Sequence, residues 1–129
     1  MIQTAALVVI YAGAAWLIFV AGLAAIAPER ARTALAAMGS TVALNWAEHA
    51  PRALVGAAMV VRAPEAVWPN AFAIAGWFIL ASSAVILSMP RRWHNGYARW
   101  WAARMPATLI RFIAIPALAL AVLLAYGAM

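Results

Sequence analysis

The chain contains no cysteine, aspartate or lysine, and only 9% of its 129 residues are charged. The lack of cysteine excludes disulfides, thiolate nucleophiles and cysteine-ligated metals. Without aspartate there is no Ser-His-Asp set, and we find no paired membrane carboxylates, phosphate-binding glycine loop or histidine spacing typical of a metal site. We therefore expect a protein that is not an enzyme and that holds no metal.

Apolar residues dominate instead, at 69% of the chain. A soluble domain carries about 25% charged residues, and a small one cannot hide this much apolar surface from water. In lipid the backbone must satisfy its own hydrogen bonds, which permits only helices or closed barrels. The apolar runs here are continuous rather than alternating, so the sequence predicts an all-α membrane protein.

The sequence predicts four transmembrane or membrane-embedded helices, over residues 5–27, 34–61, 70–89 and 106–128. A spanning helix needs roughly 20 mostly apolar residues, and the first, third and fourth segments meet this with almost no charge. The first segment resembles a signal peptide only at Ala25–Ala27. It lacks a positive leader region and is too long, so we interpret it as a membrane helix.

The second segment is harder to assign because polar residues lie near its middle: Asn45, Glu48, His49, Pro51 and Arg52. We favour an oblique helix over residues 32–49 at the membrane boundary, which breaks at Pro51 into a short spanning segment. Proline disfavours helix in the residue before it. The alternative is a single helix that begins near Ala34 and buries the polar group.

The two halves of the chain share an order of features: helix, proline, arginine-bearing linker, proline, helix. WLIFVAGLAAIAPER and PRALVGAAMVV in the first half correspond to WFILASSAVILSMPRR and PATLIRFIAIP in the second. We predict one membrane domain, 1–129, built by tandem duplication of a two-helix hairpin, with repeat units 5–62 and 68–128. Chance similarity between two alanine-rich hairpins is the alternative.

The net charge of +6 comes entirely from arginine on the basic side. These arginines flank apolar runs and no nucleic-acid-binding fold accompanies them, so anionic lipid headgroups are the expected partner and nucleic acid is not. Both basic linkers are expected in the cytoplasm by the positive-inside rule, with both termini outside. Alanine and arginine richness without lysine suggests a bacterial inner membrane.

Polar side chains in the second segment recur at helical spacing: Thr41, Asn45, Glu48 and Arg52 fall on one stripe, with His49 beside it. Such a stripe lies along the water interface, faces a partner helix or lines a polar pathway. It is the only group of ionisable residues placed where a transporter would need one. The small multidrug transporters have a similar four-helix size, but they carry a glutamate in the first helix and this chain does not.

The linker between the third and fourth segments combines arginine with aromatic residues. On a helix, one side would carry Arg91, Asn95 and Arg99 and the other would carry the aromatic rings, as in a helix that lies among lipid headgroups. The predicted interface anchors are Arg91, Arg92, Trp93, His94, Tyr97, Arg99, Trp100, Trp101 and Arg104. Binding of a specific anionic lipid by these arginines is the alternative.

His49 and His94 are the only histidines. Each is a lone histidine near a predicted membrane boundary, and they do not occupy matching positions in the two repeats. We expect them to bond at the interface or to a partner. Axial ligation of a haem or a pigment is the alternative.

Small residues spaced by four predict faces for close helix packing: Ala21 and Ala25, Ala71 and Ala75, and Ala117, Ala121 and Ala125. The leading hypothesis is therefore a non-catalytic accessory subunit that packs against a larger inner-membrane complex, such as an energy-converting one. The alternatives are a small homo-oligomeric transporter or channel that uses Glu48, Asn45 and Arg52, and a haem- or pigment-contacting subunit.

Overall fold

The computed structural model describes all residues, 1–129, and contains helices and no sheet. Its elements are, in chain order, α1 (Ile2–Ile26), α2 (Pro28–Ala37), α3 (Val42–Arg62), the 3-10 helix η1 (Ala63–Glu65), α4 (Pro69–Ser88), α5 (Arg91–Arg104), α6 (Ala107–Phe112) and α7 (Ala114–Gly127). Only Ile113 separates α6 from α7, and together they form one apolar helix of 21 residues. The prediction of an all-helical chain is confirmed.

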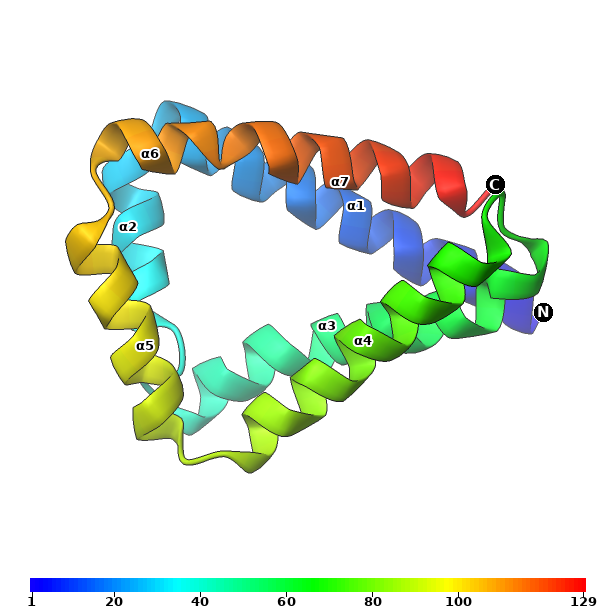
Figure 1. Cartoon of the computed structure of the whole chain (residues 1–129), viewed down its shortest axis with the longest axis horizontal. Helices are drawn as coiled ribbons and strands as arrows, with labels where there is room; N and C mark the ends of the chain where they lie inside the picture. Colours follow the sequence, from blue (N-terminus) through cyan, green and yellow to red (C-terminus); the bar gives the residue numbers. More distant parts are fainter.

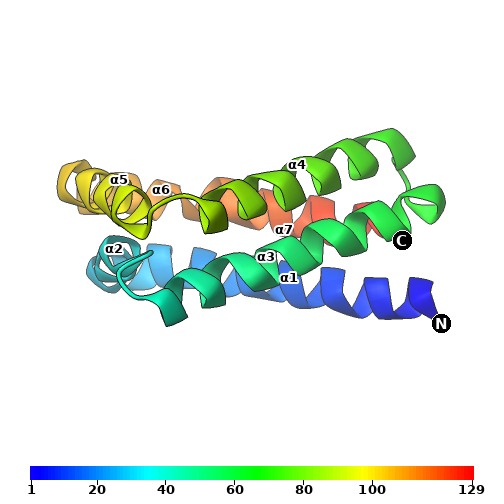
Figure 2. The same cartoon turned by 90° about the horizontal axis from the view of Figure 1, so that it is seen from below.

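The helices follow a three-sided path twice (Figure 1). α1, α2 and α3 make the first circuit, and α4, α5 and the α6–α7 helix make the second. Near α2 and α5 the two circuits form separate layers (Figure 2). α3 packs along α4, α1 along α7, and α2 along α5. Both termini lie at the end opposite α2 and α5.

The two halves thus share an order of long, short and long helices. The halves differ in how their two long helices meet. In the first half α1 packs against α3, whereas in the second half α4 and α7 make no comparable contact. The duplication itself stays a prediction.

Three helices are long and apolar enough to cross a membrane: α1, α4 and the α6–α7 helix. Their surfaces fit this environment, since all seven tryptophans of the chain are exposed. Exposed apolar surface on this scale is not found on soluble monomers. The chain has the architecture of a multi-pass membrane protein.

The expected break at Pro51 is wrong, because α3 continues through Pro51 as one helix from Val42 to Arg62. An interior proline removes one backbone hydrogen bond and costs about 3 kcal/mol in an isolated helix. Here α3 packs along α4, with Arg52 bonded to Ser82 next to the proline, and this packing outweighs the local cost. Because of its polar residues, α3 falls outside the three helices that qualify as spans by composition.

The expected single helix over residues 32–49 is also wrong. α2 ends at Ala37, and the chain turns through Gly39, which has a positive φ of 67°. Glycine adopts this conformation at little steric cost. Thr41 then caps α3, its hydroxyl accepting a hydrogen bond from the amide of Leu44 at 3.0 Å.

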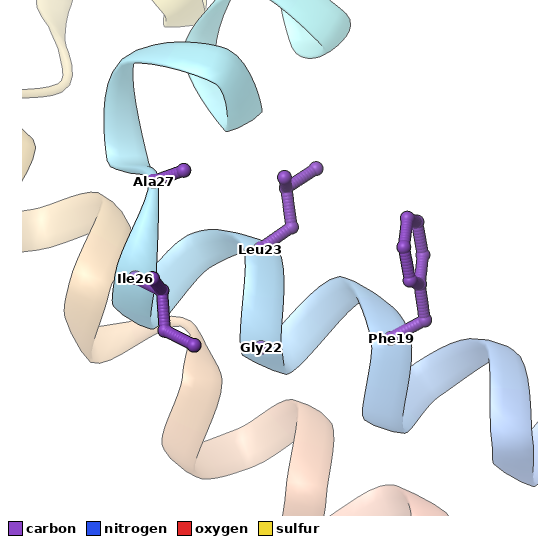
Figure 3. A pocket seen from close by; sticks show the side chains of 5 residues that line it. All are labelled: Phe19, Gly22, Leu23, Ile26 and Ala27. Carbon is purple, nitrogen blue, oxygen red and sulfur yellow. The ribbon is translucent and has the colours of Figure 1, made fainter.

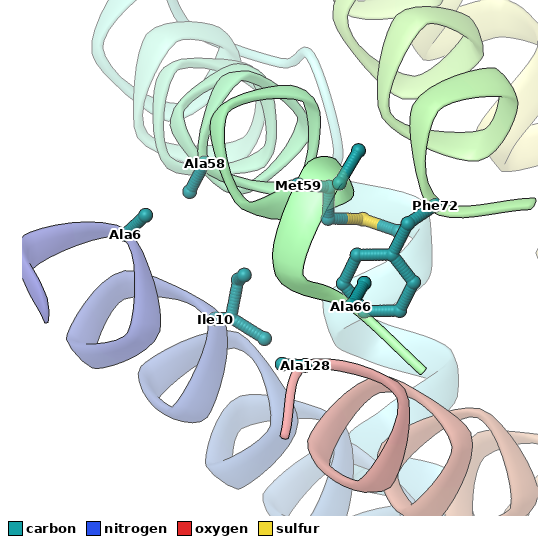
Figure 4. Close-up of a cluster of buried hydrophobic side chains, with 8 residues drawn as sticks. Ala6, Ile10, Ala58, Met59, Ala66, Phe72 and Ala128 are labelled. Carbon is teal, nitrogen blue, oxygen red and sulfur yellow. The ribbon is translucent and has the colours of Figure 1, made fainter. Parts of the chain in front are cut away.

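The main apolar core lies at the end where the termini meet η1 (Figure 4). It joins α1, α3, η1, α4 and the end of α7 through eight buried side chains: Ala6, Ile10, Ala58, Met59, Ala63, Ala66, Phe72 and Ala128. From this core the α1–α7 pair and the α3–α4 pair separate toward α2 and α5. We call α2 and α5 together the platform.

Candidate functional site

The polar stripe of α3 faces the interior of the protein near the platform. Asn45 and His49 are buried, with 4% and 5% of their surface exposed. The guanidinium of Arg52 donates to the hydroxyl of Ser82 on α4 at 2.9 Å. Thr41 is exposed and acts as the cap of the helix. The predicted stripe therefore contacts the chain's own helices.

Glu48 lies at the centre of this polar region, between α3 and α5. Its Oε2 accepts a hydrogen bond from the amide of Gly39 at 3.2 Å. The same oxygen lies 3.4 Å from Nε2 of His94 and 3.9 Å from Nε2 of His49. A carboxylate is thus held against both histidines of the chain.

His49 and His94 meet although 45 residues separate them in the sequence. Their Nε2 atoms are 3.3 Å apart, and the rings are edge to face with centroids separated by 4.9 Å. Nδ1 of His49 is buried without a hydrogen-bond partner, and so is Oδ1 of Asn45 one helical turn earlier. We call Glu48, His49 and His94 the His-Glu cluster.

The two histidines of the His-Glu cluster do not have the arrangement of imidazoles that sandwich a haem, while contact of a single histidine with a haem or pigment stays a prediction. Two axial imidazoles lie on opposite faces of a macrocycle, so their nitrogens are about 4 Å apart with the ring plane between them. Here the two Nε2 atoms are closer, and Oε2 of Glu48 faces the same point. The side chains converge on a space for a single small ion or proton.

We expected the polar face of α5 to face lipid headgroups, but two of its residues bond to the end of α2. Arg91 donates to the carbonyl of Ser40 at 2.7 Å, and Asn95 donates to the carbonyl of Met38 at 2.7 Å. The last carbonyls of a helix lack partners within it. Arg91 and Asn95 supply donors where α2 ends, which fixes α5 against α2.

The remaining predicted anchors on α5 are exposed: Arg92, Trp93, Tyr97, Arg99, Trp100, Trp101 and Arg104. The guanidinium of Arg104 lies 4.1 Å from the ring centre of Trp100, a cation–π distance. Six of the nine arginines belong to the platform, namely Arg30, Arg32, Arg91, Arg92, Arg99 and Arg104. The platform is therefore both basic and aromatic.

The predicted small-residue faces are divided between internal and external surfaces. Ala21, Ala117 and Ala121 are buried, and Ala21 and Ala117 belong to one cluster between α1 and α7. Ala25 and Ala71 remain exposed, while Ala75 and Ala125 are half-buried. Much of the small-residue signal is accounted for by packing inside the chain.

A shallow apolar hollow lies on α1 close to the platform (Figure 3). Phe19, Gly22, Leu23, Ile26 and Ala27 line it. Phe19 and Leu23 project on the side of α1 toward which α2 turns. A Cβ added at Gly22 would meet nothing within 4 Å. We call this surface the α1 hollow.

Several residues that organise the structure escaped the sequence analysis. Arg62 is buried and donates from Nε to the carbonyl of Ala128 at 2.9 Å. Gly56 and Gly76 bring the backbones of α3 and α4 into contact. The sequence Gly39-Ser40-Thr41 did carry a signal for the boundary between α2 and α3, because glycine is common just after a helix and threonine just before one. The meeting of His49 with His94 had no signal in the spacing along the chain.

Compared with known proteins, the chain matches no protein-family model, no curated sequence and no solved structure.

Proposed function

We propose that this protein is a non-catalytic subunit of a larger membrane complex, which it joins by packing its uncovered helix faces against partner helices. The α1 hollow carries this proposal. It is an apolar depression with glycine at its floor, on a long apolar helix. Small residues let helices approach closely in lipid, where packing drives association.

In this proposal α3 is the fourth span. It has 21 residues, about 30 Å at 1.5 Å per residue, which matches the hydrocarbon core. Its charged side chains all have partners within the protein: Glu48 with Gly39, Arg52 with Ser82, and Arg62 with Ala128. Charged residues inside membranes are tolerated when they are paired in this way.

If α3 crosses the membrane, the orientation of the whole chain relative to the membrane follows. α3 runs antiparallel to α4, from the platform to the end that holds both termini (Figure 1). The platform then lies on one side of the membrane and the termini on the other. The six platform arginines favour the cytoplasmic side for it, against anionic headgroups. A bacterial inner membrane is the compartment that we propose.

The test is gentle extraction of the protein from its native membrane, followed by mass and composition analysis. We expect stoichiometric co-purification with larger subunits. Gly22→Leu should abolish it, because a Cβ at this position meets nothing within 4 Å and the longer side chain would fill the α1 hollow. Gly96→Leu is the matched control, since a Cβ at Gly96 on α5 also meets nothing within 4 Å.

Migration as a pure homo-oligomer would contradict the subunit proposal. It would favour the second candidate, a small transporter that uses the polar stripe. One observation supports that candidate, since Glu48 lies half-buried between α3 and α5, as a transport role requires. Transport would then be tested in vesicles with Glu48→Gln, which retains the size of the side chain and removes its charge.

A further inference from the structure

We propose that Glu48, His49 and His94 bind one divalent transition-metal ion, and that Zn²⁺ is the ion that their arrangement fits best. The proposal does not depend on a partner complex, because all three side chains belong to this chain. One ligand atom from each residue faces the same point, and the three atoms lie within 4.8 Å of one another.

The spacing of these atoms matches a coordination shell. Zinc binds imidazole nitrogen and carboxylate oxygen at about 2.0–2.2 Å, so adjacent ligands of a tetrahedral ion are about 3.4 Å apart. The two Nε2 atoms are 3.3 Å apart, and Oε2 of Glu48 is 3.4 Å from His94 and 3.9 Å from His49. Two of the three separations match the edge of the tetrahedron, and the third, between Glu48 and His49, exceeds it by about half an ångström.

Hydrogen bonding alone describes the His-Glu cluster less well. An N–H···O bond usually spans about 2.7–3.2 Å, and both contacts of Glu48 with the histidines are longer than this. If both imidazoles are neutral, the Nε2 of His94 offers at most one hydrogen to two acceptors, His49 and Glu48. A cation between the three atoms would be coordinated by one lone pair from each of them.

The donor set selects the class of ion. Two imidazole nitrogens and one carboxylate suit zinc and its first-row neighbours, whereas Mg²⁺ and Ca²⁺ prefer oxygen alone. The three protein ligands leave a fourth position for water or another ligand, as in sites that contain two histidines and a glutamate. The chain offers no thiolate to compete for the ion.

A second observation around the site points in the same direction. A histidine that ligates a metal through one nitrogen donates its other N–H to an acceptor, which fixes the ring. Nδ1 of His49 is buried without a hydrogen-bond partner, and Oδ1 of Asn45, an acceptor one turn earlier on α3, is also buried without one. The Gly39 amide already holds the carboxylate of Glu48. Gly39 is therefore a positioning residue of the site, and Oδ1 of Asn45 is an acceptor available to His49 once its Nε2 holds a metal.

Bound metal would join α3 to α5, and so the first half of the chain to the second. α5 is otherwise fixed to the first half by Arg91 and Asn95, through the end of α2. The ion adds a direct bond from the platform to the bundle. Metal binding should therefore raise the thermal unfolding temperature of the protein.

The experiment uses the full chain in detergent, carrying a purification tag without histidine and stripped of metal with a chelator. Co²⁺ is the spectroscopic probe, because its visible absorption reports tetrahedral coordination, and Zn²⁺ is the competitor. We expect one Co²⁺ per chain, displaced by one Zn²⁺. Zn²⁺ should also raise the unfolding temperature of the wild type.

Three variants test the ligands, and one serves as the control. Loss of a neighbour of a ligand typically weakens metal binding by about 10–100-fold, so His49→Ala, His94→Ala and Glu48→Gln should each weaken it by about 100-fold or more. Glu65→Gln should bind as the wild type does, because Glu65 is remote from the cluster and pairs with Arg62.

The folding of each variant is checked by circular dichroism without metal. Should an alanine variant fail to fold, Glu48→Gln still decides the question, because it keeps the shape of a half-buried side chain. Absence of stoichiometric Co²⁺ binding to the wild type would overturn the proposal and leave the cluster as a hydrogen-bonded contact. Unchanged affinity in Glu48→Gln would overturn it equally, since the metal would then be bound elsewhere.

Discussion

Replacing Gly56 with leucine is expected to separate α3 from α4 and to destabilise the protein strongly. A Cβ at Gly56 would lie 2.8 Å from the backbone nitrogen of Leu80 and 2.9 Å from the carbonyl oxygen of Gly76. Backbone atoms of a packed helix cannot rotate away from a clash as the end of a flexible side chain can. Because α3 and α4 form the most extensive helix pair of the fold, the whole pair must move apart.

The expected size follows from two opposing effects. Overpacking of a tight contact costs about 1–3 kcal/mol, and occasionally more. Leucine recovers nearly 1 kcal/mol because glycine is a poor helix former. With a side chain as large as leucine, we expect a net loss of about 2 kcal/mol or more in the free energy of unfolding. The measurement is unfolding by SDS in mixed micelles, followed by tryptophan fluorescence.

The matched control is Gly22→Leu on α1, where an added Cβ meets nothing within 4 Å. It makes the same chemical change in another helix and should be neutral or slightly stabilising in the purified protein. If Gly56→Leu were as stable as Gly22→Leu, the close approach of α3 and α4 would be contradicted.

Replacing Arg62 with methionine is expected to release the C-terminal end of α7. Only 8% of Arg62 is exposed, and its guanidinium donates to the carbonyls of Ala128 and Met129 and to Glu65. Hydrogen bonds to charged groups contribute about 1.5–3 kcal/mol each. Methionine fills much of the same space but leaves the Ala128 carbonyl buried without its donor. We expect a loss of about 2–3 kcal/mol in the free energy of unfolding.

Two controls separate the parts of this effect. Arg92→Met removes an exposed arginine from α5 and should change stability by less than about 0.5 kcal/mol. Glu65→Gln removes only the ion pair, whose carboxylate side chain is 52% exposed, so it should cost little compared with Arg62→Met. Equal losses in Arg62→Met and Glu65→Gln would show that the carbonyl contacts contribute nothing. Hydrogen exchange of the last turn of α7 reports the same release directly.

Helix positions in this chain follow from the sequence, because length and apolar composition are local properties. α1, α4 and the α6–α7 helix begin and end close to the predicted limits. α3 was predicted poorly, since Pro51 and the polar stripe are unfavourable when judged alone. Packing along α4 outweighs both, and that packing depends on Gly56 and Gly76, which lie 20 residues apart.

At the candidate site, too, contacts between residues distant in the sequence could not be predicted. Glu48 and His49 were singled out, but His94 was assigned to the headgroup layer because it shares a linker with arginines and tryptophans. Its inward position follows from the docking of α5 on α2 through Arg91 and Asn95. No periodicity in the chain encodes that docking. Buried clusters formed by residues distant in sequence become visible only when the helices are assembled.

The most direct test of this account is the side of the membrane on which each end of α3 lies. The chain has no cysteine, so a single cysteine at either end can be labelled without background. Ser40→Cys, in the turn between α2 and α3, marks the platform end of α3, and Pro64→Cys, in η1, marks the opposite end; both positions are exposed. The reagent is a membrane-impermeant maleimide applied to intact cells and to inverted vesicles. If α3 spans the membrane, we expect Pro64→Cys to react only from outside and Ser40→Cys only from the cytoplasm. Reaction of both from the same side would show that α3 does not cross, and would contradict the four-span membrane domain.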